Sequence, residues 1–377
     1  MRQVTPLGSF LLDAIRAVAA YLVVVGHGVG FVYADVLKDP MAPYVQNIAV
    51  TVFFIVSGYV IAQQLDKFQQ QQRTFGDYFC NRAARVYSGL VPALIFIALA
   101  DVAAIMAGLA YSHTKALNLH TFVANLFMLQ DFPKWARAWS PVTSFGSGRP
   151  LWTLAVECWI YLAVGWAVFK RADLSAGHRT AWVVLVLFSI VPFANLYGGR
   201  GTGLFLYWLA GALAYWVISR TLADRAEPRL FLAGAVVVGI AALFRLWRAN
   251  GDGYDPGFAL CAALCFGLLM AASSLASGTQ PRGRAIASYF AGASYTLYLT
   301  HYTIHTHLVA AMNAYQWPKA WVLLVALILP VPVALLIASQ TERKYRQLAD
   351  WLLQVFGAQR SASVARPERD VSTRGAS

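Results

Sequence analysis

The sequence predicts an all-α, polytopic membrane protein with about ten transmembrane helices. Of its 377 residues, 59% are hydrophobic and only 12% are charged, whereas roughly 25% are charged in a typical soluble domain. A bilayer core is crossed by about 20 apolar residues in a helix, and its lack of water excludes open sheets. Runs of this kind are predicted at 9–31, 45–65, 86–110, 150–169, 180–196, 203–219, 230–247, 257–277, 287–311 and 320–340.

The first of these runs has the position of a secretory signal. It contains Asp13, Arg16 and His27 within its apolar stretch, and a cleaved signal gains nothing from ionisable groups in its hydrophobic region. We therefore expect a permanent helix. Pro192 and Pro330 interrupt two of the later runs, and proline weakens the prediction of a continuous helix there.

The net charge of +13 has a simple explanation in membrane topology. With both termini on the cytoplasmic side, the internal segments carry twenty of the 30 Lys and Arg residues and the external loops carry nine, with Arg16 inside a span. Because cytoplasmic loops are enriched in Lys and Arg, this orientation in the inner (plasma) membrane is favoured. No nucleic-acid partner is needed to explain the charge.

Two segments outside the spans are distinctive. Residues 111–149 contain an apolar piece too short to span the membrane, followed by Trp135 and Trp139, which predicts an interfacial or re-entrant cap on the outer face. The chain thus divides into a transmembrane domain at 1–340 and a cytoplasmic tail at 341–377, in which an amphipathic surface anchor precedes a disordered end.

Ionisable residues inside the predicted spans indicate where the chemistry lies, because each is costly in lipid. Arg16 and His27 are eleven residues apart, so they point within about 20° of each other and lie roughly 16 Å apart along the helix. Glu157 and His301 are predicted at a depth similar to that of His27, in the outer half of the membrane. Arg82 and Arg85 lie at the cytoplasmic entry of the third span.

Each of these residues also has a less specific interpretation. A single intramembrane histidine often bridges helices by hydrogen bonds, and basic residues at a helix entry often only set topology. The three histidines His301, His305 and His307 have no cysteine or carboxylate near them in sequence, so we expect no metal. The four cysteines lack the spacing of a zinc site or a disulfide framework.

Five motifs, in order, resemble the signatures of the acyltransferase-3 family of integral-membrane O-acyltransferases. They are Leu12–Ala20 followed in sequence by His27, Phe53–Ile61, Arg82–Tyr87, Leu151–Glu157 and Ser294–His301. The resemblance to the family extends over residues 11–340. Two positions depart from the common family pattern: Ser88 stands where proline is frequent, and Cys158 replaces a polar residue.

The resemblance implies a ten-helix enzyme that moves an acyl group, usually acetyl, from cytoplasmic acetyl-CoA to a hydroxyl of a cell-envelope carbohydrate. It implies catalytic roles for Arg16, His27 and Glu157, with His301 as a further candidate, and places Arg82 and Arg85 at the donor. A histidine can take the proton of an acceptor hydroxyl, or form an acyl intermediate. The alternative from the residues alone is a proton-coupled transporter or flippase of a glycan or small solute.

Overall fold

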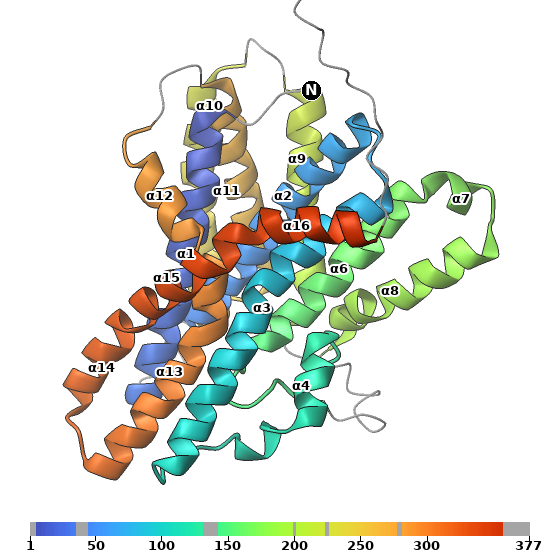
Figure 1. Cartoon of the computed structure of the whole chain (residues 1–377). Helices are drawn as coiled ribbons and strands as arrows, with labels where there is room; N and C mark the ends of the chain where they lie inside the picture. Colours follow the sequence, from blue (N-terminus) through green and yellow to red (C-terminus); the bar gives the residue numbers. More distant parts are fainter. Residues whose placement is uncertain are drawn as a thin grey trace, which may run out of the picture.

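The chain folds into a bundle of long helices joined by shorter ones (Figure 1). The computed structural model describes residues 5–34, 44–130, 142–198, 201–222, 226–276 and 281–356, and within these ranges it contains no strand. The long helices are α1 Pro6–Val32, α2 Val45–Gln70, α3 Phe75–Met106, α6 Leu151–Phe169, α8 Arg179–Tyr197, α9 Leu204–Thr221, α10 Pro228–Arg248, α11 Pro256–Leu275 and α13 Ser294–Tyr315. The shorter ones are η2 Thr114–Ala116, α4 Leu119–Leu126, α7 Arg171–Ser175, α12 Arg284–Ala291, α14 Lys319–Ile328, α15 Pro330–Gln340, η3 Glu342–Lys344 and α16 Tyr345–Val355.

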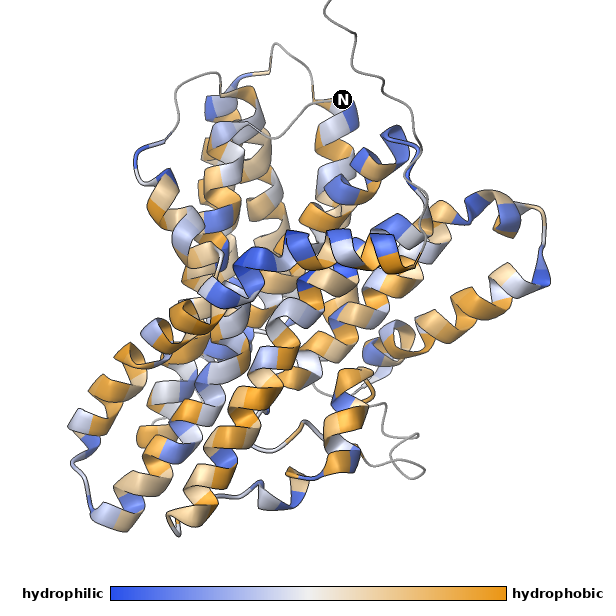
Figure 2. Cartoon of the chain, in the orientation of Figure 1, coloured by the Kyte–Doolittle hydropathy of each residue, from blue (hydrophilic) through white to orange (hydrophobic). Residues whose placement is uncertain are grey.

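Large apolar side chains cover the outside of the bundle. On α10, Val236 and Val237 are 63% and 66% exposed, and Leu243 is 67% exposed. Figure 2 shows the hydrophobic colour continuing over α3, α8 and α14. A soluble protein rarely exposes so large an apolar surface, so these faces contact lipid. In the described ranges, eight helical segments are long and apolar enough to cross a membrane, which confirms a polytopic, all-helical membrane protein.

The predicted number of ten spans remains a prediction, as does the orientation of the termini. Two predicted spans, α9 and α13, are not among the eight apolar segments, and α13 is rich in threonine, histidine and tyrosine. The eighth segment joins α14, α15 and α16 into one stretch, Lys319–Val355. Hydropathy therefore does not decide the count.

The structure divides the last two predicted spans into shorter helices. The predicted span at 287–311 is interrupted at Gly292 and Ala293, between α12 and α13. The predicted span at 320–340 is interrupted where α14 gives way to α15. Pro330 begins α15, since proline has no N–H to donate and is tolerated in the first turn of a helix.

The third helix starts earlier than predicted. A capping box of Thr74 and Asp77 begins α3 at Phe75, eleven residues before the predicted start of the span. With 32 residues, α3 is about 48 Å long and exceeds the thickness of a hydrocarbon core of about 30 Å. Its first turns, which carry Arg82 and Arg85, extend the helix toward the end of the bundle where α1 begins.

Close packing of α2 against α9 fixes the position of the polar residues on α2. A Cβ atom on Gly58 would lie 1.9 Å from the Trp208 carbonyl oxygen, and one on Gly211 would lie 1.8 Å from the Ile55 carbonyl oxygen. Only glycine allows the two backbones to approach so closely. Ser57, next to Gly58, is thereby held at the helix interface.

The segment before α6 turns back into the bundle. The Tyr87 hydroxyl donates to the Leu126 carbonyl at the end of α4, and Trp159 Nε1 donates to the Met128 carbonyl just after it. These contacts place the end of α4 beside α3 and α6. Trp135, Trp139 and the predicted disordered end of the tail fall outside the described residues.

Candidate active site

In the described part of the chain, two neighbouring cavities lie along α1, one lined by residues of its first half and the other by His27 in its second half. The larger, which we call the arginine cavity, has a volume of about 480 Å³. The polar and charged side chains that line it are Asp13, Arg16, Ser57, Arg82, Arg85, Thr153, Glu157, Tyr161, Ser288, Ser294, Tyr295, Tyr298, Tyr345 and Arg346. The smaller, the histidine cavity, has a volume of about 280 Å³ and is lined by His27, Gln46, Asn47, Val50, Arg149, Pro150, Trp152, Gly201, Tyr254, Tyr298 and Tyr302.

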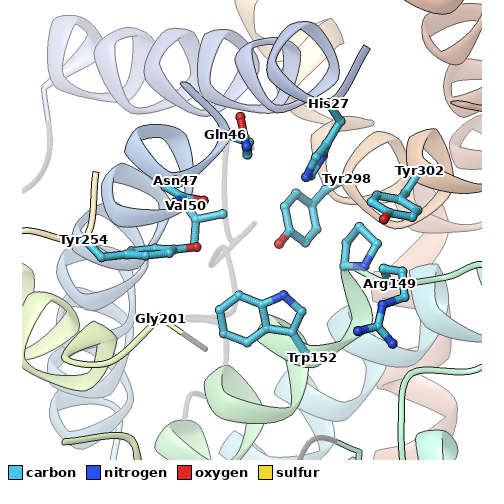
Figure 3. Close-up of a pocket in the computed structure, with 11 residues that line it drawn as sticks. His27, Gln46, Asn47, Val50, Arg149, Trp152, Gly201, Tyr254, Tyr298 and Tyr302 are labelled. Carbon is cyan, nitrogen blue, oxygen red and sulfur yellow. The ribbon is translucent and has the colours of Figure 1, made fainter. Parts of the chain in front are cut away.

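The two cavities share lining residues. Val50 and Tyr298 line both of them, so the cavities adjoin at these side chains. The Tyr298 hydroxyl is 2.8 Å from the Thr153 hydroxyl. Figure 3 shows His27 and Tyr298 pointing into the histidine cavity, with Trp152 across from them. The shared side chains of Val50 and Tyr298 therefore form part of the boundary between the two cavities.

The histidine that lines this cavity is paired with a second, buried histidine behind it. His27 Nδ1, on α1, lies 2.9 Å from His301 Nε2, on α13, and the two rings are stacked with their centroids 5.2 Å apart. The sequence predicted a common depth for these residues, and the structure brings them into direct contact.

The hydrogen bonds assign the tautomer of each ring when both are neutral. His301 Nδ1 is 3.0 Å from the Leu297 carbonyl oxygen, which can only accept, so this nitrogen carries the proton. A neutral imidazole has one donor and one acceptor, and His301 Nε2 must therefore accept from His27 Nδ1. The lone pair of His27 is consequently on Nε2, the nitrogen that remains available as a base.

The other histidines of α13 have separate partners. His305 Nε2 is 2.9 Å from the Ala326 carbonyl oxygen of α14. His307 Nε2 is 2.8 Å from Asp101 Oδ1. No group of three or more potential metal ligands occurs in the described part of the chain.

Glu157 lies in the arginine cavity and not beside His27. Its Oε1 accepts a hydrogen bond of 2.7 Å from the Ser57 hydroxyl and another from the Tyr161 hydroxyl. The hydroxyls of Ser57 and Tyr161 are themselves 2.8 Å apart. The carboxylate is thus bound to α2 and to its own helix, because α6 directs it toward α2.

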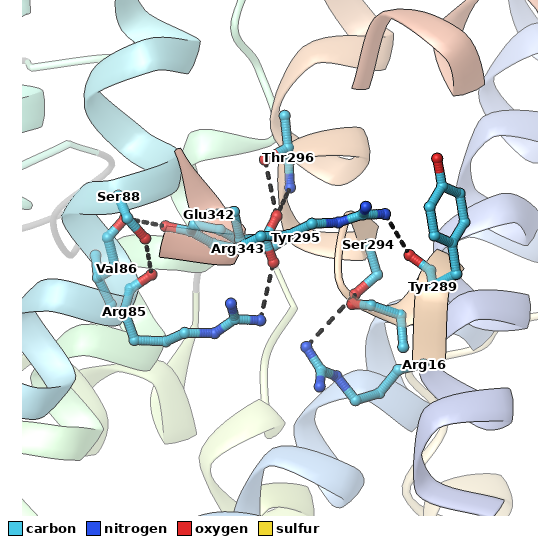
Figure 4. Close-up of polar contacts among 11 residues, drawn as sticks. Arg16, Arg85, Val86, Ser88, Tyr289, Ser294, Tyr295, Thr296, Glu342 and Arg343 are labelled. Atoms are coloured by element: carbon cyan, nitrogen blue, oxygen red, sulfur yellow. Dashed lines mark hydrogen bonds and ion pairs between the residues drawn. The ribbon is translucent and has the colours of Figure 1, made fainter. Parts of the chain in front are cut away.

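The three predicted arginines line one cavity but differ in their partners. Arg16 Nη2 is 3.5 Å from the Ser294 hydroxyl, and Arg82 Nη2 donates to Asn81 at 3.2 Å. Arg85 forms an ion pair of 2.8 Å with Glu342, as Figure 4 shows. Arg85 therefore has a buried counter-charge within the chain, whereas Arg82 does not pair with a carboxylate in the described residues.

A second polar cluster holds the loop that enters the histidine cavity. Asp101, on α3, is fully buried and accepts from the Ser147 backbone N–H at 2.8 Å and from its hydroxyl at 2.6 Å, besides its contact with His307. Gly146 has a positive φ of 50°, and a Cβ there would lie 2.2 Å from Asp101 Oδ2. The carboxylate thus fixes the turn that delivers Arg149 to the cavity.

Sequence reasoning missed several of these residues. Tyr298 belongs to a motif that was recognised, but nothing in its spacing shows that it borders two cavities. Asp101 was available as an acid within a predicted span, and its cost in lipid is the signal that could have found it. Glu342 lies just beyond the last predicted span and gave no such signal.

Comparison with known proteins identifies the family of this chain. A family model described as an acyltransferase domain matches residues 11–339. The chain is 26% identical over 255 residues to an O-acetyl transferase of Shigella phage Sf6, over 64% of this chain and 71% of that protein. No solved structure was found to match the chain. Since the family model covers nearly the whole helical bundle, the chain belongs to the acyltransferase-3 family and is a membrane-embedded acyltransferase.

Proposed function

We propose that this protein is an O-acyltransferase that moves an acetyl group from cytoplasmic acetyl-CoA to a hydroxyl of a cell-envelope carbohydrate, within the inner membrane. The observation that carries the proposal is the meeting of two chemically different cavities at Tyr298 and Val50. One is lined by arginines and suits an anionic donor. The other carries a histidine base and suits a neutral, polar acceptor.

The charge of the arginine cavity supports binding of a phosphorylated donor. Its lining has four arginines, Arg16, Arg82, Arg85 and Arg346, against two carboxylates, Asp13 and Glu157. The Nε atom of Arg82 is buried and has no hydrogen-bond partner in the described residues. Such an unsatisfied donor is costly unless a ligand accepts from it, and guanidinium groups bind phosphate by charge-assisted hydrogen bonds.

The histidine cavity supports acceptance of a sugar hydroxyl. Gln46 and Asn47 provide amide donors and acceptors, and Trp152 and Tyr302 provide aromatic faces. Polar groups placed among aromatic side chains are typical of a site that orients a small ligand. The acceptor would enter this cavity from the end opposite the arginines.

His27 is the base in the proposed reaction. Its Nε2 takes the proton of the acceptor hydroxyl, whose oxygen forms a bond to the acyl carbon. The thioester C–S bond breaks, and the departing sulfur receives the proton from His27. His301 accepts from His27 Nδ1 throughout and keeps the ring in the productive tautomer, in the way that a carboxylate orients the histidine of a hydrolytic triad.

The direct test uses the purified protein in proteoliposomes with acetyl-CoA and an envelope glycan extract. Mass spectrometry should find an ester on the glycan with the wild-type protein and not with His27→Gln. His305→Gln is the matched control, because His305 is buried on α13 and lines neither cavity. Glycan that crosses the membrane without gaining an ester would instead support the transporter alternative.

Sidedness is tested with the same vesicles. Acetyl-CoA does not cross the bilayer, so activity should require the donor on the face at which α1 begins. Equal activity with the donor confined to the opposite face would contradict the assignment of the arginine cavity to the donor.

A further inference from the structure

The chain beyond the last predicted span forms part of the arginine cavity. Tyr345 and Arg346, the first two residues of α16, line that cavity together with Arg82 and Arg85. Figure 1 shows α16 running across α3, with which it is in contact. These residues lie outside residues 11–339, the region that the family model matches.

A buried carboxylate holds this segment in place. Glu342 is 0% exposed and accepts from the Thr296 backbone N–H at 3.0 Å and from the Thr296 hydroxyl at 2.8 Å. Thr296 is in the first turn of α13, where backbone N–H groups lack partners within the helix. A carboxylate is favourable there because of the unpaired N–H groups and the helix dipole.

The same carboxylate also binds α3. Arg85 Nη2 is 2.8 Å from Glu342 Oε1, and the Arg85 guanidinium lies 5.3 Å from the centre of the Tyr345 ring. Next to Glu342, Arg343 donates to the Tyr289 carbonyl at 2.9 Å and lies over its ring at 4.0 Å. Figure 4 shows the contacts of Glu342 with Arg85 and Thr296 and the contact of Arg343 with Tyr289. The start of α16 is therefore fixed by three helices of the bundle.

In this arrangement, the arginines at the mouth of the arginine cavity differ in whether a carboxylate neutralises them. Arg85 is neutralised by Glu342, whereas Arg82 retains an unpartnered Nε. Arg346 adds a guanidinium on the side of the cavity formed by α16, and its side chain is exposed and in contact with Tyr345. Two guanidinium groups, Arg82 and Arg346, thus border the same space from different elements.

We propose that Tyr345 and Arg346 are donor-binding residues: Arg346, with Arg82, holds a phosphate group of the nucleotide end of acyl-CoA, and Tyr345 provides the adjoining wall. The Arg85–Glu342 pair positions both. This inference rests on the proposed use of acyl-CoA. It gives α16 a role in the active site besides that of an amphipathic surface helix.

The test compares two cations of one segment. Lys344 is exposed, contacts Gln340 at 3.0 Å and does not line the cavity, so Lys344→Ala removes the same charge as Arg346→Ala without touching the site. CoA affinity is measured by equilibrium titration of the full-length protein in neutral detergent. Arg346→Ala should raise the Kd for CoA about tenfold or more, the scale of a hydrogen bond to a charged group, and Lys344→Ala should leave it unchanged.

A donor without phosphates gives a second readout. With S-acetyl-pantetheine, which lacks the nucleotide, Arg346→Ala and the wild type should have the same KM. A persistent difference would mean that Arg346 acts on the fold and not on a phosphate, and would overturn the inference.

Two binding results would also overturn it. Equal Kd values for wild type and Arg346→Ala, with CoA bound normally, would overturn this inference alone. Equal weakening by Lys344→Ala and Arg346→Ala would show a general effect of surface charge, as expected of a helix that only contacts anionic lipid. If the wild-type protein bound no CoA at all, the proposed donor would be wrong, and this inference would be wrong as well.

Discussion

His27 and Glu157 line different cavities, and the boundary between the cavities lies between them. His27 Nδ1 is hydrogen-bonded to His301, whereas Glu157 Oε1 is hydrogen-bonded to Ser57 and Tyr161. Tyr298 lines both cavities. In the proposed reaction the imidazole acts on the acceptor, while the carboxylate lies among the arginines of the arginine cavity.

The His27–His301 contact predicts that the acceptor function of His301 matters more than its ring. His301→Leu removes the acceptor for His27 Nδ1–H and should lower kcat by about 100-fold or more, the scale of a general base, with little change in the donor KM. His301→Gln retains an acceptor oxygen and should keep a larger part of the activity. Steady-state kinetics of both variants is the measurement, and equal losses in the two would refute a positioning role.

The position of Glu157 predicts that its charge is essential. Glu157→Gln preserves size and hydrogen-bonding capacity but removes the negative charge that offsets Arg16 and Arg82 in the arginine cavity. We expect turnover to fall by about tenfold or more, as electrostatic contributions to an active site typically do. Ser57→Ala keeps the charge and loses one hydrogen bond, so its effect should be smaller. Wild-type turnover of Glu157→Gln would show that the carboxylate is structural.

Because Arg85 and Glu342 form an ion pair, we expect removal of Arg85 to lower the stability of the protein before it affects catalysis. Arg85→Ala leaves the buried Glu342 carboxylate without its counter-charge, and removing one partner of a buried pair costs about 3–5 kcal/mol. The double variant Arg85→Ala with Glu342→Gln should be more stable than Arg85→Ala alone. Thermal unfolding in detergent measures both, and simple additivity of the two substitutions would argue against the pair.

The Asp101 cluster predicts an effect on the acceptor alone. Asp101→Asn weakens the hydrogen bonds that hold Ser147, and with them the turn that presents Arg149 to the histidine cavity. The KM for the glycan should rise while the Kd for CoA stays at the wild-type value. Ser147→Ala, which keeps the backbone hydrogen bond, serves as the milder comparison. A parallel loss of CoA affinity would mean that Asp101 supports the whole bundle.

The sequence predicted the helical architecture and the residues that carry charge into the bundle, because both leave local signals. Apolar runs mark α1, α2 and α6 closely, and each ionisable residue in such a run has a cost that draws attention to it. The family was also recognised correctly from its ordered motifs. These features depend on neighbours along the chain.

The contacts between helices could not be predicted in the same way. Position along each helix predicted a common depth for His27, Glu157 and His301, but it does not define the rotation of each helix about its own axis. The side of α6 that carries Glu157 faces α2, where the carboxylate accepts a hydrogen bond from Ser57. The burial of Glu342 depends on η3 folding back onto Thr296, 46 residues away in sequence.

The junction of the two cavities at Tyr298 and Val50 bears on the permeability of the membrane. An enzyme with a cavity at each end of its bundle must not become a leak for protons or ions. In the proposed reaction only the slender acyl-bearing arm of the donor has to reach past these two side chains, while the nucleotide and the sugar stay in their own compartments. Replacing Tyr298 by a small residue should therefore increase proton leakage through the vesicles, a property that a purely cytoplasmic acyltransferase never has to control.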